Sequence, residues 1–159
     1  MFDFQDLFRH SAAKRPITEE EVFQASEQFY AALESFLNGD AKPMIEVWSH
    51  GPDVTGMHSA PGRQVGWEEV RAAWEQFASL TSDGKVTIHD LLVHVGGDLA
   101  YTIGTERAQA TFGGEQVQFE NRVTNIYRRE AGGWKMVHHH IDLSPQVQEI
   151  VSRLQPSSG

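Results

Sequence analysis

Apolar residues in the first half of the chain recur at intervals of three and four positions, which is the spacing of amphipathic helices. Thr18, followed by Glu21 three residues later, forms a capping box that predicts a helix start, and Asn38-Gly39 predicts its end. Similar spacing predicts a brief helix over 43–48 and a longer one over 67–80. This half of the chain is therefore expected to be mainly helical.

From residue 85 onward the pattern changes to the alternation of apolar and polar residues that is typical of strands. The predicted strands cover 85–95, 99–112, 115–129 and 134–143. Their links are short and contain glycine, as in hairpins. A short earlier strand is predicted over 53–58, and a short final helix over 145–154 with Pro145 at its first position. Helices followed by an antiparallel meander predict an α+β fold with the helices on one face of the sheet.

The length and charge of the chain narrow the classes of partner. A chain of 159 residues is the size of one domain, and residues 1–159 are interpreted as one. The 22 acidic and 13 basic residues give a net charge of −9, and the basic residues are scattered. Nucleic acid and membrane surfaces are therefore poor partner candidates, because both need clustered positive charge.

The absence of cysteine from the sequence excludes disulfides, thiolate metal ligands and cysteine nucleophiles. The apolar residues near the start are interrupted by Asp3 and Asp6, which argues against a signal peptide. No apolar run approaches the roughly 20 residues that a membrane span requires. A cytoplasmic location is the resulting expectation.

Several segments together resemble the SnoaL-like branch of the nuclear transport factor 2-like superfamily. They are VWSH (47–50), GWEEV (66–70), VHVGGDLAYT (93–102), RVTNIYRR (122–129) and WKMVHHH (134–140). The SnoaL-like proteins that this order resembles are relatives of the ketosteroid isomerase, scytalone dehydratase and limonene epoxide hydrolase groups. The last strand resembles the association domain of calmodulin-dependent kinase II as well.

The resemblance spans roughly residues 18–143 and leaves a flexible start, 1–15, and a C-terminal tail, 144–159. It implies a cone in which a curved antiparallel sheet wraps the N-terminal helices and leaves a pocket. It also implies a homodimer formed through the outer face of the sheet. It does not imply one reaction, because members of the superfamily isomerise, dehydrate, hydrolyse, cyclise or only bind.

The histidine run near the end of the last predicted strand is the main candidate for chemistry. His138, His140 and Asp142 share one face of that strand, and Val137, His139 and Ile141 share the other. If the first face is concave, two imidazoles and a carboxylate enter the pocket as acid/base candidates. The alternatives are a structural network or a wet dimer interface.

A His-x-His pair on a strand also has metal-ligand spacing, with a third ligand from His58, His94 or Asp142. Neither a metal nor a cofactor is predicted, because the family resemblance calls for none. The family's isomerases and dehydratases use an Asp base near the pocket. Asp53 and Asp142 are available, but neither is an obvious match.

Aromatic residues with a polar atom are the best candidates for the pocket wall, since they suit a partly wet site. The predicted wall residues are Trp48, His58, Trp74, Phe77 and Tyr101, of which all but Phe77 carry such an atom. Arg122 belongs to the wall only if the strand register turns it inward. An inward Arg122 would need a carboxylate partner, for which Glu106 is the nearest candidate.

Two functions are compatible with these residues. The first is a cofactor-independent acid/base enzyme of the isomerase, dehydratase, hydrolase or cyclase type, acting on a small apolar or aromatic molecule. His138 and His140 would then exchange protons, and Arg122 would orient the ligand. The alternative is a non-catalytic ligand-binding or dimeric association module in which the histidines are structural.

Overall fold

The computed structural model describes residues 17–155, and the expected flexible start at 1–15 lies outside them. The helices are α2 (Ile17–Phe36), α3 (Lys42–Val47), α4 (Trp67–Ala78) and α5 (Pro145–Leu154). The strands are β1 (Thr55–Met57), β2 (Gln64–Val65), β3 (Thr81–Gly96), β4 (Leu99–Phe112), β5 (Glu115–Glu130) and β6 (Gly133–Ile141). The predicted order of helices and strands is confirmed, except that β2 was not predicted.

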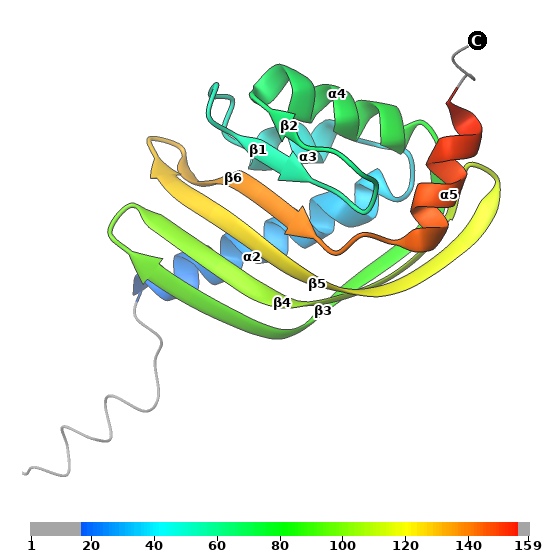
Figure 1. Cartoon of the computed structure of the whole chain (residues 1–159). Coiled ribbons are helices and arrows are strands. Elements are labelled where there is room, and N and C mark those ends of the chain that lie inside the picture. Colours follow the sequence, from blue (N-terminus) through cyan, green and yellow to red (C-terminus); the bar gives the residue numbers. More distant parts are fainter. Residues whose placement is uncertain (1–16, 156–159) are drawn as a thin grey trace, which may run out of the picture.

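The strands form one six-stranded sheet in the order β2-β1-β6-β5-β4-β3. The four long strands make the predicted antiparallel meander. β1 pairs in parallel with β6 and carries β2 at the outer edge, an extension that the periodicity does not predict. The sheet is curved and unclosed, and α2 runs along its concave side (Figure 1).

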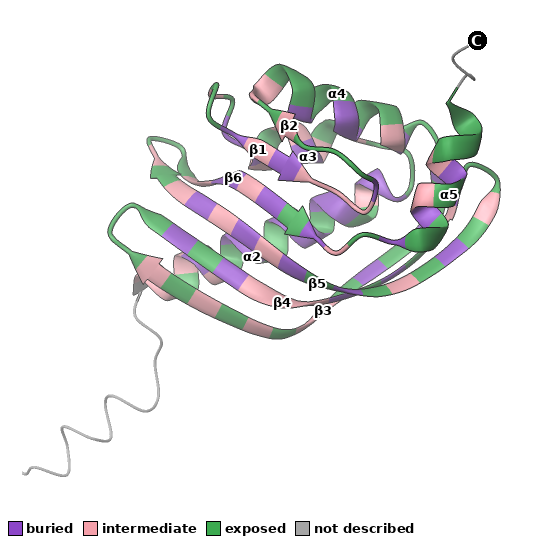
Figure 2. Cartoon of the chain, in the orientation of Figure 1, coloured by how far each residue is buried: buried purple, intermediate pink, exposed green. Residues whose placement is uncertain are grey.

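The curvature of the sheet has a local cause in β3. Its pairing with β4 is interrupted between Ser82 and Lys85 and again between His89 and Leu92. Asp83 and Asp90, which lie in these interruptions, have positive φ angles of 53° and 54°. Such bulges bend a strand and increase its twist, so β3 can wrap around α2. Burial alternates along the strands, since successive side chains point to opposite faces and one face is turned to the core (Figure 2).

A third irregularity, in β6, decides which histidines face the interior. Tyr127 pairs with Met136, whereas Ile126 pairs with His138, so Val137 is an extra residue in β6. Because side chains alternate along a strand, this extra residue reverses the parity of the residues after it. Met136, His139 and Ile141 are consequently buried, while His140 is exposed.

The C-terminal tail was expected to be flexible apart from a short helix, and residues 145–154 pack as α5 against the end of the sheet. Val147 and Ile150 are buried, and Arg153 pairs with Glu115 at 2.6 Å. The Ser144 hydroxyl caps the helix by accepting from the Val147 amide. Among the helices of residues 17–155, none combines the length and apolar character that a membrane span requires.

Candidate functional site

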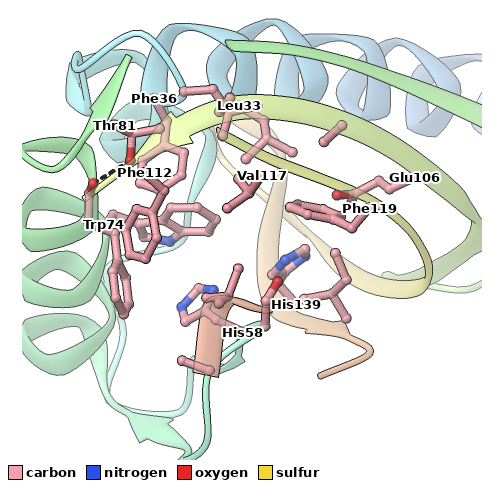
Figure 3. A pocket seen from close by; sticks show the side chains of 18 residues that line it. Leu33, Phe36, His58, Trp74, Thr81, Glu106, Phe112, Val117, Phe119 and His139 are labelled. Carbon is pink, nitrogen blue, oxygen red and sulfur yellow. Dashed lines mark hydrogen bonds between the residues drawn. The ribbon is translucent and has the colours of Figure 1, made fainter. Parts of the chain in front are cut away.

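A largely apolar cavity of about 100 Å³ lies between the concave face of the sheet, α2, α4 and α5 (Figure 3). Its wall is contributed by distant parts of the chain: α2, the segment after β1, α4, the inner faces of β4, β5 and β6, and α5. The lining residues are Leu33, Phe36, Leu37, His58, Ser59, Ala60, Trp74, Phe77, Thr81, Glu106, Ala108, Ala110, Phe112, Val117, Phe119, His139, Ile141 and Val147.

Glu106 is the acidic residue of this wall, and only 2% of it is exposed. It lies on the inner face of β4, and the Tyr30 hydroxyl from α2 donates to its Oε2 at 3.1 Å. Neither arginine nor lysine occurs among the lining residues, all of which belong to the described part of the chain. Burial without a cation raises the pKa of Glu106 to about 7, and the Tyr30 hydrogen bond opposes this only in part.

His139 is the second polar group of the wall and is 2% exposed. Its Nδ1 lies 2.6 Å from the Asn125 Oδ1 on the neighbouring strand β5. An amide oxygen can only accept, so Nδ1 of His139 carries the proton and Nε2 keeps its lone pair. Burial, and then the nearby His58, holds the pKa of His139 well below its usual range. The ring is therefore neutral at physiological pH.

His58, just after β1, is the third polar group. Its ring lies 4.7 Å from that of Trp74 and 5.7 Å from that of His139, measured between centroids. His58 is partly exposed as a residue, but its Nε2 is buried and has no hydrogen-bond partner among the described residues. Burial lowers the pKa of His58 to about 4, so this ring is also neutral.

Glu106 is the group of these three that is poised to exchange a proton with a bound molecule near neutral pH. A carboxyl with a pKa of about 7 is present in both protonation states, which is the condition for an efficient general acid or base. The neutral imidazoles can accept a proton or a hydrogen bond. Because the wall has no cationic side chain, the cavity does not suit a carboxylate, a phosphate or a phosphate-bearing cofactor.

The structure places three of the predicted site residues in the cavity wall: His58, Trp74 and Phe77. Trp48 does not reach it. That residue is 1% exposed, and its ring centroid lies 6.3 Å from that of Trp74. Trp48 is therefore a residue of the hydrophobic core.

His138 and His140 do not enter the cavity, and the expectation that their face is the concave one does not hold. The extra residue in β6 turns both to the outer face of the sheet, where their rings lie 6.1 Å apart. The His138 Nδ1 is 2.6 Å from the Thr55 Oγ1 on β1. His140 borders a shallow groove on that face.

Arg122, Asp142 and Tyr101 also lie outside the cavity. The β4–β5 register pairs Arg122 with Thr105, so Arg122 is on the face opposite to Glu106, and the suggested pair between them does not form. Arg122 instead donates to both carboxylate oxygens of Asp142, at 3.0 and 3.2 Å. Tyr101 is 44% exposed and stacks on His94 at 5.0 Å.

The sequence interpretation missed Glu106, Tyr30 and His139, although a signal for two of them was present. Val137 and Ile141 flank His139 at alternate positions, so burying these aliphatic residues carries His139 inward. Glu106 shares its face of β4 with Ala108 and Ala110, which marks it as a carboxylate on a buried face. No comparable signal identifies Tyr30 among the apolar positions of α2.

Within residues 17–155, no three histidine, aspartate or glutamate side chains converge as a metal ion would require. The carboxylate of Glu106 is bound to Tyr30, and His139 is bound to Asn125. The ionisable groups of the cavity are thus organised by hydrogen bonds within the protein.

The protein-family model described as a SnoaL-like domain matches residues 22–145, which is most of the chain. The chain belongs to the SnoaL-like family. The comparison with curated proteins gives no match. The structural neighbours have the nuclear transport factor 2-like or cystatin-like fold, which agrees with the α+β architecture and the curved sheet of this SnoaL-like protein.

Two solved structures share more than a quarter of their residues with this SnoaL-like chain. A candidate dehydratase of the nuclear transport factor 2-like family from Streptomyces avermitilis is 27% identical, with a TM-score of 0.71 over 79% of this chain and 95% of that one. A candidate calcium/calmodulin-dependent protein kinase type II association domain from Thiobacillus denitrificans is 29% identical, with a TM-score of 0.62 over 76% and 92%.

A more distant neighbour is a candidate aromatic ring hydroxylase from Novosphingobium aromaticivorans. It is 17% identical, with a TM-score of 0.70 over 90% of this chain and 94% of that one. At this identity the likeness shows the fold alone. Proteins with different assigned roles therefore share this architecture, and the site has to supply the argument for function.

The raised pKa of Glu106 predicts a characteristic pH dependence of stability. Between pH 4.5 and about 7 the unfolded chain has lost this proton and the folded chain keeps it, so the free energy of unfolding falls as pH rises. The contribution is roughly 3 kcal/mol across that range. In urea unfolding, the difference in the free energy of unfolding between the wild type and Glu106→Gln should therefore change by about this amount between pH 4.5 and 7.

Glu120→Gln is the matched control, because Glu120 is an exposed glutamate paired with Arg107 on the outer face. Its unfolding curve should keep the pH dependence of the wild type. Buried His58 and His139 have lowered pKa values, so they reduce the free energy of unfolding as pH falls below 6.5, which is opposite in direction to the effect of Glu106. This reduction is the same in all three proteins. A difference between wild type and Glu106→Gln that is flat from pH 4.5 to 7 would contradict the assignment.

Proposed function

We propose that this SnoaL-like protein is a cofactor-independent acid/base enzyme that acts on a small, mainly apolar molecule in the interior cavity. The observation that carries the proposal is a buried carboxyl, Glu106, without a cationic partner, in the same apolar wall as two neutral imidazoles. Perturbed titratable groups that converge on a cavity are typical of active sites.

Dehydration is the reaction type that the groups support best. Protonated Glu106 gives its proton to a leaving hydroxyl, which departs as water. The Nε2 of His139 takes a proton from the adjacent carbon, and the electrons of that C–H bond form the new double bond. One proton enters and one leaves, so return of the His139 proton to Glu106 through solvent restores the enzyme. The candidate dehydratase from Streptomyces avermitilis, at 27% identity, is consistent with this type.

The size of the cavity limits the ligand. An apolar cavity of about 150 Å³ accepts one benzene molecule, and this one measures about 100 Å³. Because this cavity is the smaller of the two, a molecule with a single ring is the largest that it can accept. Partly exposed wall residues such as Phe77 and Ser59 must shift slightly to admit it. Larger ligands would need α5, which contributes Val147 to the wall, to move.

Turnover of a one-ring probe tests the proposal. The conversion of 3-hydroxycyclohexanone to cyclohexenone can be followed by ultraviolet absorbance, and the wild type should accelerate it over buffer. Glu106→Gln should lower kcat/KM by about 100-fold or more, because general acid catalysis contributes that much. In the wild type kcat should fall as pH rises above about 7, since the reactive form of Glu106 is protonated.

His140→Gln is the matched control for His139→Gln, because it changes the same residue type one position away on the outer face. The proposal predicts loss of turnover in His139→Gln and wild-type turnover in His140→Gln. The opposite pattern would transfer the chemistry to the outer face and refute the role of the cavity. A wild type no faster than buffer would count against the enzyme itself.

A second function, self-association, is favoured by a separate observation. The outer face of β3 and β4 exposes Leu92 (54%), Leu99 (51%) and Tyr101 (44%), a row of large apolar side chains that an isolated chain leaves in water. The 29% identical neighbour is described as an association domain. We propose that this face binds a second copy of the chain and that the pocket operates within a homodimer.

Sedimentation of two charge variants tests the interface. Tyr101→Glu places a carboxylate in the middle of the apolar row and should shift the protein to monomer, because an unpaired charge is costly to bury. Leu143→Glu is the control, since Leu143 is equally exposed (56%) but lies in the link between β6 and α5. A Tyr101→Glu protein that sediments like the wild type would exclude this face.

A further inference from the structure

The hydrogen bonds around the cavity fix which kind of polar group its interior can satisfy. The Tyr30 hydroxyl uses its hydrogen on Oε2 of Glu106, at 3.1 Å, so the phenol oxygen is left as an acceptor. Burial, and then the nearby Glu106, raises the pKa of Tyr30, and the Asn125 amide opposes this only in part. The Nδ2 of Asn125 is buried and has no hydrogen-bond partner among the described residues. This arrangement directs the Asn125 Oδ1 toward His139.

Asn125 is thus a positioning residue for His139. With Oδ1 at 2.6 Å from Nδ1, the ring must hold its proton at Nδ1, and the ring's other nitrogen, Nε2, is a lone-pair acceptor. Asn125 is 0% exposed and cannot be replaced by water in this role. One tautomer of His139 is therefore selected before any ligand arrives.

His58 differs, because no hydrogen bond fixes its tautomer. Its Nε2 and the Oε1 of Gln64 are both buried, and neither has a hydrogen-bond partner among the described residues. A neutral imidazole carries one acceptor nitrogen in either tautomer. The Thr81 hydroxyl, also in the wall, donates to the Phe77 carbonyl oxygen at 2.6 Å, so its hydrogen is not available to a ligand.

We infer that the cavity selects a one-ring compound bearing a hydroxyl group, because Nε2 of His139 is an acceptor that only a ligand hydrogen can satisfy, while the buried Nε1 of Trp74 in the same wall is an unpartnered donor among the described residues. A hydroxyl can donate to Nε2 of His139 and still accept a hydrogen bond from the wall, from Trp74 or from Glu106 when that carboxyl is protonated. A carbonyl or ether of the same size accepts but cannot donate, so it leaves Nε2 of His139 unpartnered. This inference rests on the proposed function and names the ligand class of the same site.

Binding of four probes of similar size tests the selection. Titration calorimetry with phenol, anisole, benzaldehyde and toluene should give an affinity for phenol about tenfold or more above that of the other three, as expected for one buried hydrogen bond gained and one unpaired acceptor avoided. Benzaldehyde or anisole binding as tightly as phenol would overturn the inference. If none of the four binds, the small-molecule cavity itself is refuted, and the inference with it.

Glu106→Gln gives an internal check when binding is measured above pH 7, because the amide places a hydrogen-bond donor where the ionised carboxyl has none. The preference for phenol over benzaldehyde should fall in this variant, while the affinity for toluene stays unchanged. An unaltered preference would show that Glu106 does not contact the polar group of the ligand and would overturn its part in the selection.

Asn125→Asp keeps an acceptor opposite His139 and should keep the preference for phenol, whereas Asn125→Leu should lose it. Nitrogen-15 NMR of His139 in the wild type provides a readout that does not depend on a variant that folds. The proton is expected on Nδ1, and Asn125→Asp should preserve this state. A wild-type His139 protonated on Nε2 would overturn the inference.

Discussion

The carboxyl of Glu106 is the group on which the rest of the site depends. It is 2% exposed and, among the described residues, its hydrogen-bond partner is the Tyr30 hydroxyl rather than a cation. Burying a charge without a partner costs several kcal/mol, so the group shifts its pKa and remains protonated to about pH 7. The fold tolerates this cost at a position where a proton donor faces an apolar hollow, which is an arrangement typical of acid/base sites.

The two faces of the sheet carry separate features. The concave face bears Glu106, Asn125 and His139, which hydrogen bonds hold in place. The convex face bears the apolar row around Tyr101 and the pair of Arg122 with Asp142. Because alternate side chains of β4 lie on opposite faces, this strand both lines the cavity and carries part of the exposed apolar row.

The fold was predictable from the sequence because its signals are long. Periodic apolar positions identify α2, α4 and the meander, and the glycine links mark the hairpins. The short strand β1 was predicted over 53–58, but β2 and the parallel pairing of β1 with β6 were not, because a strand of two residues has no period and depends on its neighbour in the sheet. Helix α5 was predicted from Pro145 and its apolar side, but its docking through Val147 is a tertiary feature.

The site was only partly predictable, for a reason that lies in β6. The set of His138 and His140 was correctly separated from that of His139, but the facing of the sets depends on the extra residue Val137 and on the partner strand. Whether Arg122 faces the pocket was left open for the same reason. Glu106 was considered only as a partner for Arg122. Its actual hydrogen-bond partner is a tyrosine 76 residues away in sequence, and no local pattern predicts such a contact.

The most direct test of the account is a carbon-13 NMR titration of the side-chain carboxyl groups in glutamate-labelled protein, with Glu106→Gln used to assign the signal. One carboxyl should titrate with a midpoint of about 7 and should be missing from the variant. That result would establish a buried proton donor in the cavity at neutral pH. If the Glu106 signal titrates between pH 4 and 5 instead, the carboxyl is solvated or paired, and the proposed acid/base site is wrong.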